Sequence, residues 1–255
     1  MLRSLFWVGY YSFLEAVRNR LLLGILLLMV PLLASSWMLD TYRLGFQAKI
    51  VKDMGLNAIS VFGLLIVLFL SLDQIIPDIE KRSIYFVLTR HPDRFLYLIG
   101  RFLGIAFTLL VYHSVMAFFL LILLRINTSA WFWEILLGSM VVYLKQALLI
   151  SIVLMLTTFL SKIVVISIAS LIYVLGHCFD ILRMLADKKS GAFIGRVVEF
   201  IAFFTPDFSL FELRLAVVHE IPIKAEALAM LGVYSLTAIA FFLGVGGIIL
   251  SKRDL

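Results

Sequence analysis

The stretch from Asp78 to Gly104 reads D-I-E-K-R-S-I-Y-F-V-L-T-R-H-P-D-R-F-L-Y-L-I-G-R-F-L-G and lies between two long apolar runs. Its apolar residues Ile84, Tyr85, Val87 and Leu88 recur at near-helical spacing, and basic residues flank them: Lys81, Arg82 and Arg90. A polar, amphipathic segment between two apolar runs must leave the bilayer. We therefore expect this segment to present a surface to a soluble partner protein.

The composition excludes a soluble domain. The chain has 255 residues, of which 63% are hydrophobic, and its mean hydropathy is +1.10. A soluble fold of this size would expose too much apolar surface to water. The net charge of +6 fits basic residues at helix ends that face anionic lipid, so no nucleic-acid partner is expected.

Six apolar runs are each long enough to cross a hydrocarbon core of about 30 Å, so we predict an all-α integral membrane protein with a single transmembrane domain over residues 1–255. The predicted spans are 21–39, 56–76, 102–124, 135–160, 163–181 and 227–250. An even number of spans places both termini on one side of the membrane.

Residues 1–20 predict an amphipathic helix that lies in the membrane interface before the first span. Its predicted apolar face holds Leu2, Leu5, Phe6, Phe13 and Val17. A cleaved signal peptide is the alternative, because Leu21–Leu33 followed by Ala34-Ser35-Ser36 resembles an apolar region with a cleavage site. The leading segment is too long and too amphipathic for that alternative to be preferred.

The distribution of Lys and Arg favours cytoplasmic termini, with segment 78–101 and Lys162 on the same side. The outer side then carries Arg43–Lys52, Arg125 and Arg183–Lys224. The two totals are nearly level, so the bias comes from charges close to the spans.

The outer segment 182–226 contains two predicted short amphipathic helices. The first carries Phe193 to Ile201, and the second begins at a predicted capping box, Ser209-x-x-Glu212. Two interpretations stay open: these helices shelter the mouth of a pathway, or they anchor the last span.

Lys145 is the one charge near the middle of the fourth span. An ammonium there costs about 2.5–3.5 kcal/mol on insertion scales, so it should face protein or a water-filled pathway. We predict a residue of the pathway or of a dimer interface; the alternative is a lysine that reaches water through its long side chain. Glu134 lies too far along the same helix, so the partner of Lys145 must come from elsewhere.

Two histidines deserve a structural interpretation. His113, inside the third span, is predicted to hydrogen-bond within the bundle. His177, Cys178 and Asp180 end the fifth span, but adjacent residues point to different sides of a helix and cannot form one site alone. The sequence contains no P-loop, no H-E-x-x-H and no G-x-S-x-G motif, so no catalytic residue is assigned.

Residues Glu80 to Arg90, then Arg94, Tyr97 to Arg101 and Gly104, resemble the first cytoplasmic loop of ABC-2 type transporter permeases, in particular the NosY-like branch. The basic ending Ser251–Leu255 is similar to the one common in that family. His91 stands where the family usually has proline, and Pro92 follows one place later.

The resemblance implies a type V exporter-like permease fold in the cytoplasmic (inner) membrane, and export as the direction of transport. The chain would work as a homodimer or heterodimer with two copies of a separate ABC ATPase, which binds the ATP and Mg²⁺. This chain would then be no enzyme and need no cofactor, and an accessory extracytoplasmic protein and membrane lipids are further possible partners. The docking residues implied are Glu80, Arg82, Tyr85, Arg90 and Arg94.

Two other classes were weighed. A secondary transporter or channel driven by an ion gradient usually has internal repeats with interrupted helices, and the two halves of this chain show no obvious similarity. A membrane enzyme lacks any motif to support it.

Overall fold

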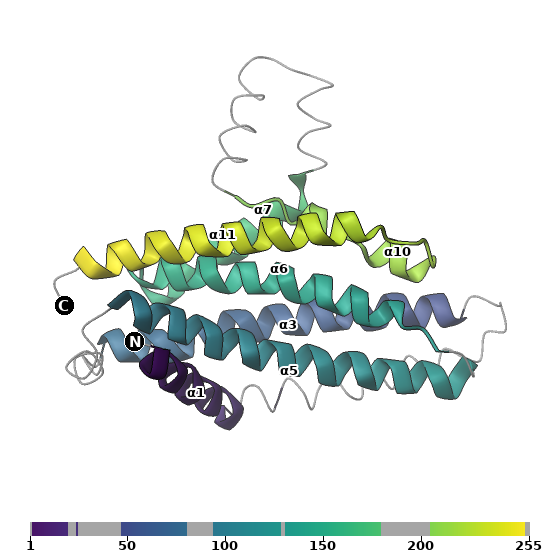
Figure 1. Cartoon of the computed structure of the whole chain (residues 1–255), viewed down its shortest axis with the longest axis horizontal. Helices are drawn as coiled ribbons and strands as arrows, with labels where there is room; N and C mark the ends of the chain where they lie inside the picture. The colour runs from purple at the N-terminus through teal and green to yellow at the C-terminus, as the bar shows by residue number, and fades with distance from the viewer. Residues whose placement is uncertain are drawn as a thin grey trace, which may run out of the picture.

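The computed structural model describes residues 2–19, 24, 47–80, 94–128, 131–179 and 205–252, and every element in this part of the chain is a helix. The elements, in order, are α1 (Leu2–Arg18), α3 (Gln47–Glu80), α5 (Arg94–Thr128), α6 (Glu134–Thr157), α7 (Lys162–His177), the 3-10 helix η2 (Ser209–Phe211), α10 (Arg214–Val218) and α11 (Ala225–Lys252). Figure 1 shows the long helices running side by side, with α1 against one end of α5.

Four helices are long and apolar enough to cross a membrane, which confirms the all-helical, multi-pass membrane class. They are α3, α5, α6 and α11, with spanning segments Ala48–Gln74, Arg94–Ile126, Glu134–Thr157 and Ala225–Lys252. They correspond to the second, third, fourth and sixth predicted spans. The first predicted span, 21–39, lies outside the described residues apart from Gly24.

The fifth predicted span is shorter than expected over the described residues. Helix α7 has 16 residues, about 24 Å, and ends at His177. The reason is a tertiary contact at its end: the amide of Phe208 donates to the carbonyl of Gly176 at 3.1 Å. A side chain at Gly176 would meet the Phe208 ring at 2.4 Å, so the returning chain needs glycine there.

The two helices around segment 78–101 extend into it. Helix α3 continues to Glu80, and α5 begins at Arg94. Both ends of the predicted segment, 78–80 and 94–101, are therefore helical, and residues 81–93 lie outside the described part of the chain.

Helix α6 is the centre of the bundle. Of its spanning segment, 78% is buried, against 33% for α11. A helix that is apolar on all sides is stable where other helices surround it. Figure 1 shows α6 lying between α11 and α5, so any polar side chain on it must find its partner inside the protein.

One end of the bundle collects α1, the end of α3, the start of α5, the start of α7 and the end of α11. Four polar contacts between these elements define it: Ser12 with Gln74, Glu15 with Arg101, Asp73 with Lys162, and Arg94 with the carbonyl of Leu250. The start of α1 and the end of α11 both lie here in Figure 1. The groups predicted to be cytoplasmic thus share one end of the molecule, and the assignment of that end to the cytoplasm stays a prediction.

Helix α1 packs on α5 through small residues. A side chain at Gly104 would meet Ser12 Cβ at 2.4 Å and the carbonyl oxygen of Gly9 at 2.6 Å. The predicted apolar face turns outward only in part: Phe6 is 66% exposed and Val17 is 45% exposed, whereas the ring of Phe13 packs against that of Phe107 on α5 at 5.0 Å. The predicted helix is present, and an outward apolar face suits the membrane interface that we expect it to occupy.

The contact at Gly104 gives a direct test of this packing. We expect Gly104→Ala to lower the stability of the purified protein by about 1–3 kcal/mol, because the added methyl overlaps α1. Gly244→Ala is the matched control, since nothing lies within 4 Å of a side chain there. That change should be neutral or slightly stabilising, because alanine favours helix more than glycine does. Equal thermal midpoints for the two variants in detergent would contradict the packing.

Candidate functional site

The buried ammonium of Lys145 is the centre of the candidate site. Lys145 lies on α6 and is 4% exposed. Its Nζ is 3.1 Å from His177 Nε2 on α7 and 3.5 Å from Ser60 Oγ on α3. It also lies 5.6 Å from the centre of the Tyr173 ring. The side chain therefore faces protein, with partners from two other helices. Its role in a pathway or dimer interface stays a prediction.

The hydrogen bonds of His177 fix its tautomer. Nδ1 lies 2.8 Å from the carbonyl oxygen of Tyr173, which can only accept a hydrogen bond. Nδ1 therefore carries the proton of the neutral ring, and Nε2 is left as an acceptor for Lys145. The Tyr173 carbonyl on α7 thus orients the ring that accepts a hydrogen bond from the Lys145 ammonium.

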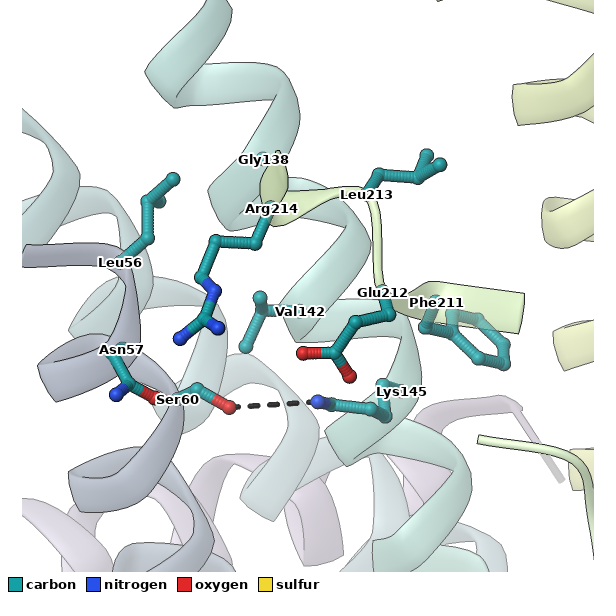
Figure 2. Close-up of a pocket in the computed structure, with 10 residues that line it drawn as sticks. All are labelled: Leu56, Asn57, Ser60, Gly138, Val142, Lys145, Phe211, Glu212, Leu213 and Arg214. Carbon is teal, nitrogen blue, oxygen red and sulfur yellow. Dashed lines mark hydrogen bonds between the residues drawn. The ribbon is translucent and has the colours of Figure 1, made fainter. Parts of the chain in front are cut away.

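Glu212 supplies the negative charge at this site. Its Oε2 lies 3.8 Å from His177 Nε2, and the carboxylate also interacts electrostatically with Lys145. Figure 2 shows the carboxylate of Glu212 and the guanidinium of Arg214 directed toward the same space as Lys145 and Ser60. The chain segment before α10 thus brings the counter-charge to the buried ammonium.

The predicted capping box at Ser209 is wrong. Ser209–Phe211 forms one 3-10 turn, and α10 begins at Arg214 without a side-chain cap. The Asp207 carboxylate accepts hydrogen bonds from both the amide and the hydroxyl of Ser209. Glu212 is directed to Lys145 and His177 instead, because a buried cation attracts a carboxylate more strongly than an exposed helix end does.

A small cavity of about 30 Å³ lies beside Lys145 (Figure 2). This is about the space of one water molecule. Its walls combine apolar residues of α3, of α6 and of segment 211–213 with five polar side chains. The lining residues are Leu56, Asn57, Ser60, Gly138, Val142, Lys145, Phe211, Glu212, Leu213 and Arg214.

Two ion pairs fasten the segment around α10 to α3, above this cavity. Arg214 Nε lies 3.2 Å from Asp53 Oδ1, without the alignment of a hydrogen bond. Lys52 Nζ donates to Glu220 Oε1 at 2.7 Å. Neighbouring residues of opposite sign on α3 thus meet a complementary pair on the outer segment.

Lys52 is fully buried, although nothing in the residues around it singles it out. Its Nζ lies 3.6 Å from the centre of the Phe132 ring, which offers a cation–π contact. The hydrogen bond and the charge of Lys52 hold the pKa of the Glu220 carboxyl below its ordinary value of 4.5. Glu220 also adopts φ 57°, a left-handed conformation that closes the end of α10 and usually selects glycine. The ion pair explains why a glutamate occupies that position.

A second polar network lies on the other side of α6. His113 on α5 bonds Ser139 at 3.1 Å and Gln146 at 2.9 Å, which confirms the predicted bundle role of His113. Gln146 also donates to the carbonyl of Ser60 at 2.8 Å. Ser60 therefore connects the two networks, since its carbonyl accepts a hydrogen bond from Gln146 and its hydroxyl accepts one from Lys145.

The implied docking residues lie away from this cluster. Glu80 ends α3, and Arg94 begins α5 and donates to the carbonyl of Leu250 at 3.0 Å. Arg82, Tyr85 and Arg90 lie outside the described residues. The structure therefore ties Arg94 to the end of α11 and brings none of these described residues to Lys145.

Within the described residues, no group of three His, Cys, Asp or Glu side chains is placed to hold a metal ion. Asp180, which the sequence places near His177, lies outside that part of the chain. No protein-family model and no curated protein matches this chain.

The Lys52–Glu220 pair predicts a pH dependence. A carboxyl whose pKa is lowered by folding stabilises the protein above its ordinary value of 4.5, and this contribution is lost as the pH falls through the lower folded value. We expect Glu220→Gln to lower the thermal midpoint at pH 7, and the gap to wild type to close below about pH 4.5. Glu226→Gln, which removes an exposed acid in the first turn of α11, is the control and should show only the small gap of a helix-end charge. A gap for Glu220→Gln that persists unchanged at pH 3 would refute the ion pair as its cause.

Proposed function

We propose that this chain is the membrane-spanning permease subunit of an ABC-2 type transporter, which acts as a dimer and is driven by a separate ATPase. The observation that carries the proposal is segment 80–104, with its family-like residues, between two of the candidate spanning helices. The ATPase would bind the ATP and Mg²⁺, because this chain has no P-loop. Export across the cytoplasmic membrane, with both termini inside, belongs to the same proposal.

The contacts at this end of the bundle support a coupling role for segment 80–94. Helices α3 and α5 flank it directly, and Arg94 links the start of α5 to the last turns of α11. Arg101 links α5 to Glu15 of α1, and Gln74 links α3 to Ser12. A displacement of residues 81–93 by the ATPase would therefore act on four helices: α1, α3, α5 and α11. Bistable packing of this kind can convert a small local shift into a movement of whole helices.

Lys145 belongs to the pathway in this proposal. Its ammonium lines a small cavity, and ionisable groups inside membrane segments commonly mark routes of ions or substrates. The cluster of Lys145, His177 and Glu212 also favours a second candidate function, a transporter driven by a proton gradient. The two candidates differ in one property: the first needs ATP and the second does not.

The test is recovery of an ABC ATPase with the tagged full-length chain from its own membrane. We expect an ATPase with a P-loop to co-purify and to hydrolyse ATP in the complex. The Glu80→Ala/Arg90→Ala double variant should recover at least tenfold less of it, since each lost anchor of an interface costs about 1–2 kcal/mol and about 1.4 kcal/mol is a factor of ten.

The control is the Lys224→Ala/Glu226→Ala double variant, which removes one base and one acid at the opposite end. It should recover as much ATPase as wild type. Undiminished recovery with Glu80→Ala/Arg90→Ala would remove segment 80–94 from the interface. Absence of any ABC ATPase, with transport that persists without ATP, would support the gradient-driven candidate instead.

A further inference from the structure

The ring of His177 lies between a cation and an anion. Its Nε2 is 3.1 Å from the Lys145 ammonium and 3.8 Å from Glu212 Oε2. The other ring nitrogen is held by the carbonyl of Tyr173 at 2.8 Å. The single free position of the ring, Nε2, therefore has two competing neighbours of opposite charge.

We propose that His177 is a proton-operated switch, which determines whether the ammonium of Lys145 donates a hydrogen bond to its ring. In the neutral ring, Nε2 accepts a hydrogen bond from Lys145. When a proton from solvent adds to Nε2, the lone pair is consumed, the ring becomes a cation, and it pairs with the Glu212 carboxylate 3.8 Å away as an ion pair. Lys145 then loses its nearest partner and retains Ser60 at 3.5 Å. Release of the proton restores the first state.

The charged groups around the ring support two alternative states. Lys145 on α6 opposes a cationic ring by like-charge repulsion, whereas Glu212 favours it by attraction. From its own helix the ring meets Tyr173, and from the returning chain it meets the uncharged ring of Phe208 at 5.8 Å. Arg214, beside Glu212, is paired with Asp53. The competition at Nε2 is therefore between one cation and one anion.

The proposed titrating group lies at the surface of the protein. The side chain of His177 is 24% exposed and that of Glu212 is 44% exposed, whereas Lys145 is 4% exposed. The titrating group and its anionic partner are thus accessible, and the cation they control is buried. Protonation of a histidine in such a place changes its hydrogen-bond partner.

The consequence for transport rests on the proposed function: acidification on the side of the α10 segment would free Lys145 for an anionic group of the cargo. The switch itself does not need that function. Its test therefore uses the full chain in detergent without ATPase or cargo.

The experiment is nuclear magnetic resonance of protein labelled with ¹⁵N-histidine, with the His177 signal assigned by its loss in His177→Gln. At neutral pH we expect the tautomer with the proton on Nδ1. Lys145→Met should shift half-protonation of His177 to higher pH and Glu212→Gln to lower pH, each by about one pH unit. Lys224→Met and Glu226→Gln, which remove the same charges elsewhere, should leave it unmoved.

Two results would overturn the switch. One is a neutral ring with its proton on Nε2, which wild-type protein alone reveals even if a variant fails to fold. The other is a midpoint that does not move, or moves the same way, in Lys145→Met and Glu212→Gln. Either result leaves the permease proposal standing, because that proposal depends on recovery of the ATPase.

Discussion

The ammonium of Lys145, buried in the most enclosed of the candidate spanning helices, is the constraint on which the half of the structure around α10 depends. A charge at that depth costs a few kcal/mol unless it is hydrogen-bonded and compensated. No partner is available on α6 itself, so Ser60 comes from α3, His177 from α7, and the compensating carboxylate from the segment before α10. Three parts of the chain that are far apart in sequence thus gather around one ammonium group.

The described part of the molecule thus has two polar regions. At one end, the Lys145 cluster lies under a segment held to α3 by the Arg214–Asp53 and Lys52–Glu220 pairs. At the other end, the helix ends around residues 81–93 are tied together through Arg94 and Arg101. Helix α6 lies inside the bundle between them, which offers a rigid element through which a movement at one end can reach the other.

Hydrophobic runs predicted the long helices because the length of an apolar segment is a local property of the sequence. The cost of a buried charge likewise predicted that Lys145 faces protein. Neither argument could name Glu212, since it is the tertiary fold that brings residues 205–221 to α6. For the same reason the burial of Lys52 could not be predicted, since its partner Glu220 is 168 residues away. The end of α7 at His177 could not be predicted either, because Phe208 contacts it from a distant part of the chain. Glu212-Leu213-Arg214, charges among large apolar residues, is the signal that would have pointed to this segment.

The central claim is that Glu212 compensates the buried charge of Lys145, and a double-mutant cycle measures this directly. Stabilities of wild type, Lys145→Met, Glu212→Gln and the double variant would be compared by unfolding with sodium dodecyl sulfate in detergent micelles. The account predicts that the double variant loses less stability than the two single losses added together, with a coupling above about 0.5 kcal/mol. Losses that simply add would contradict it, because they would show that the carboxylate and the ammonium do not interact.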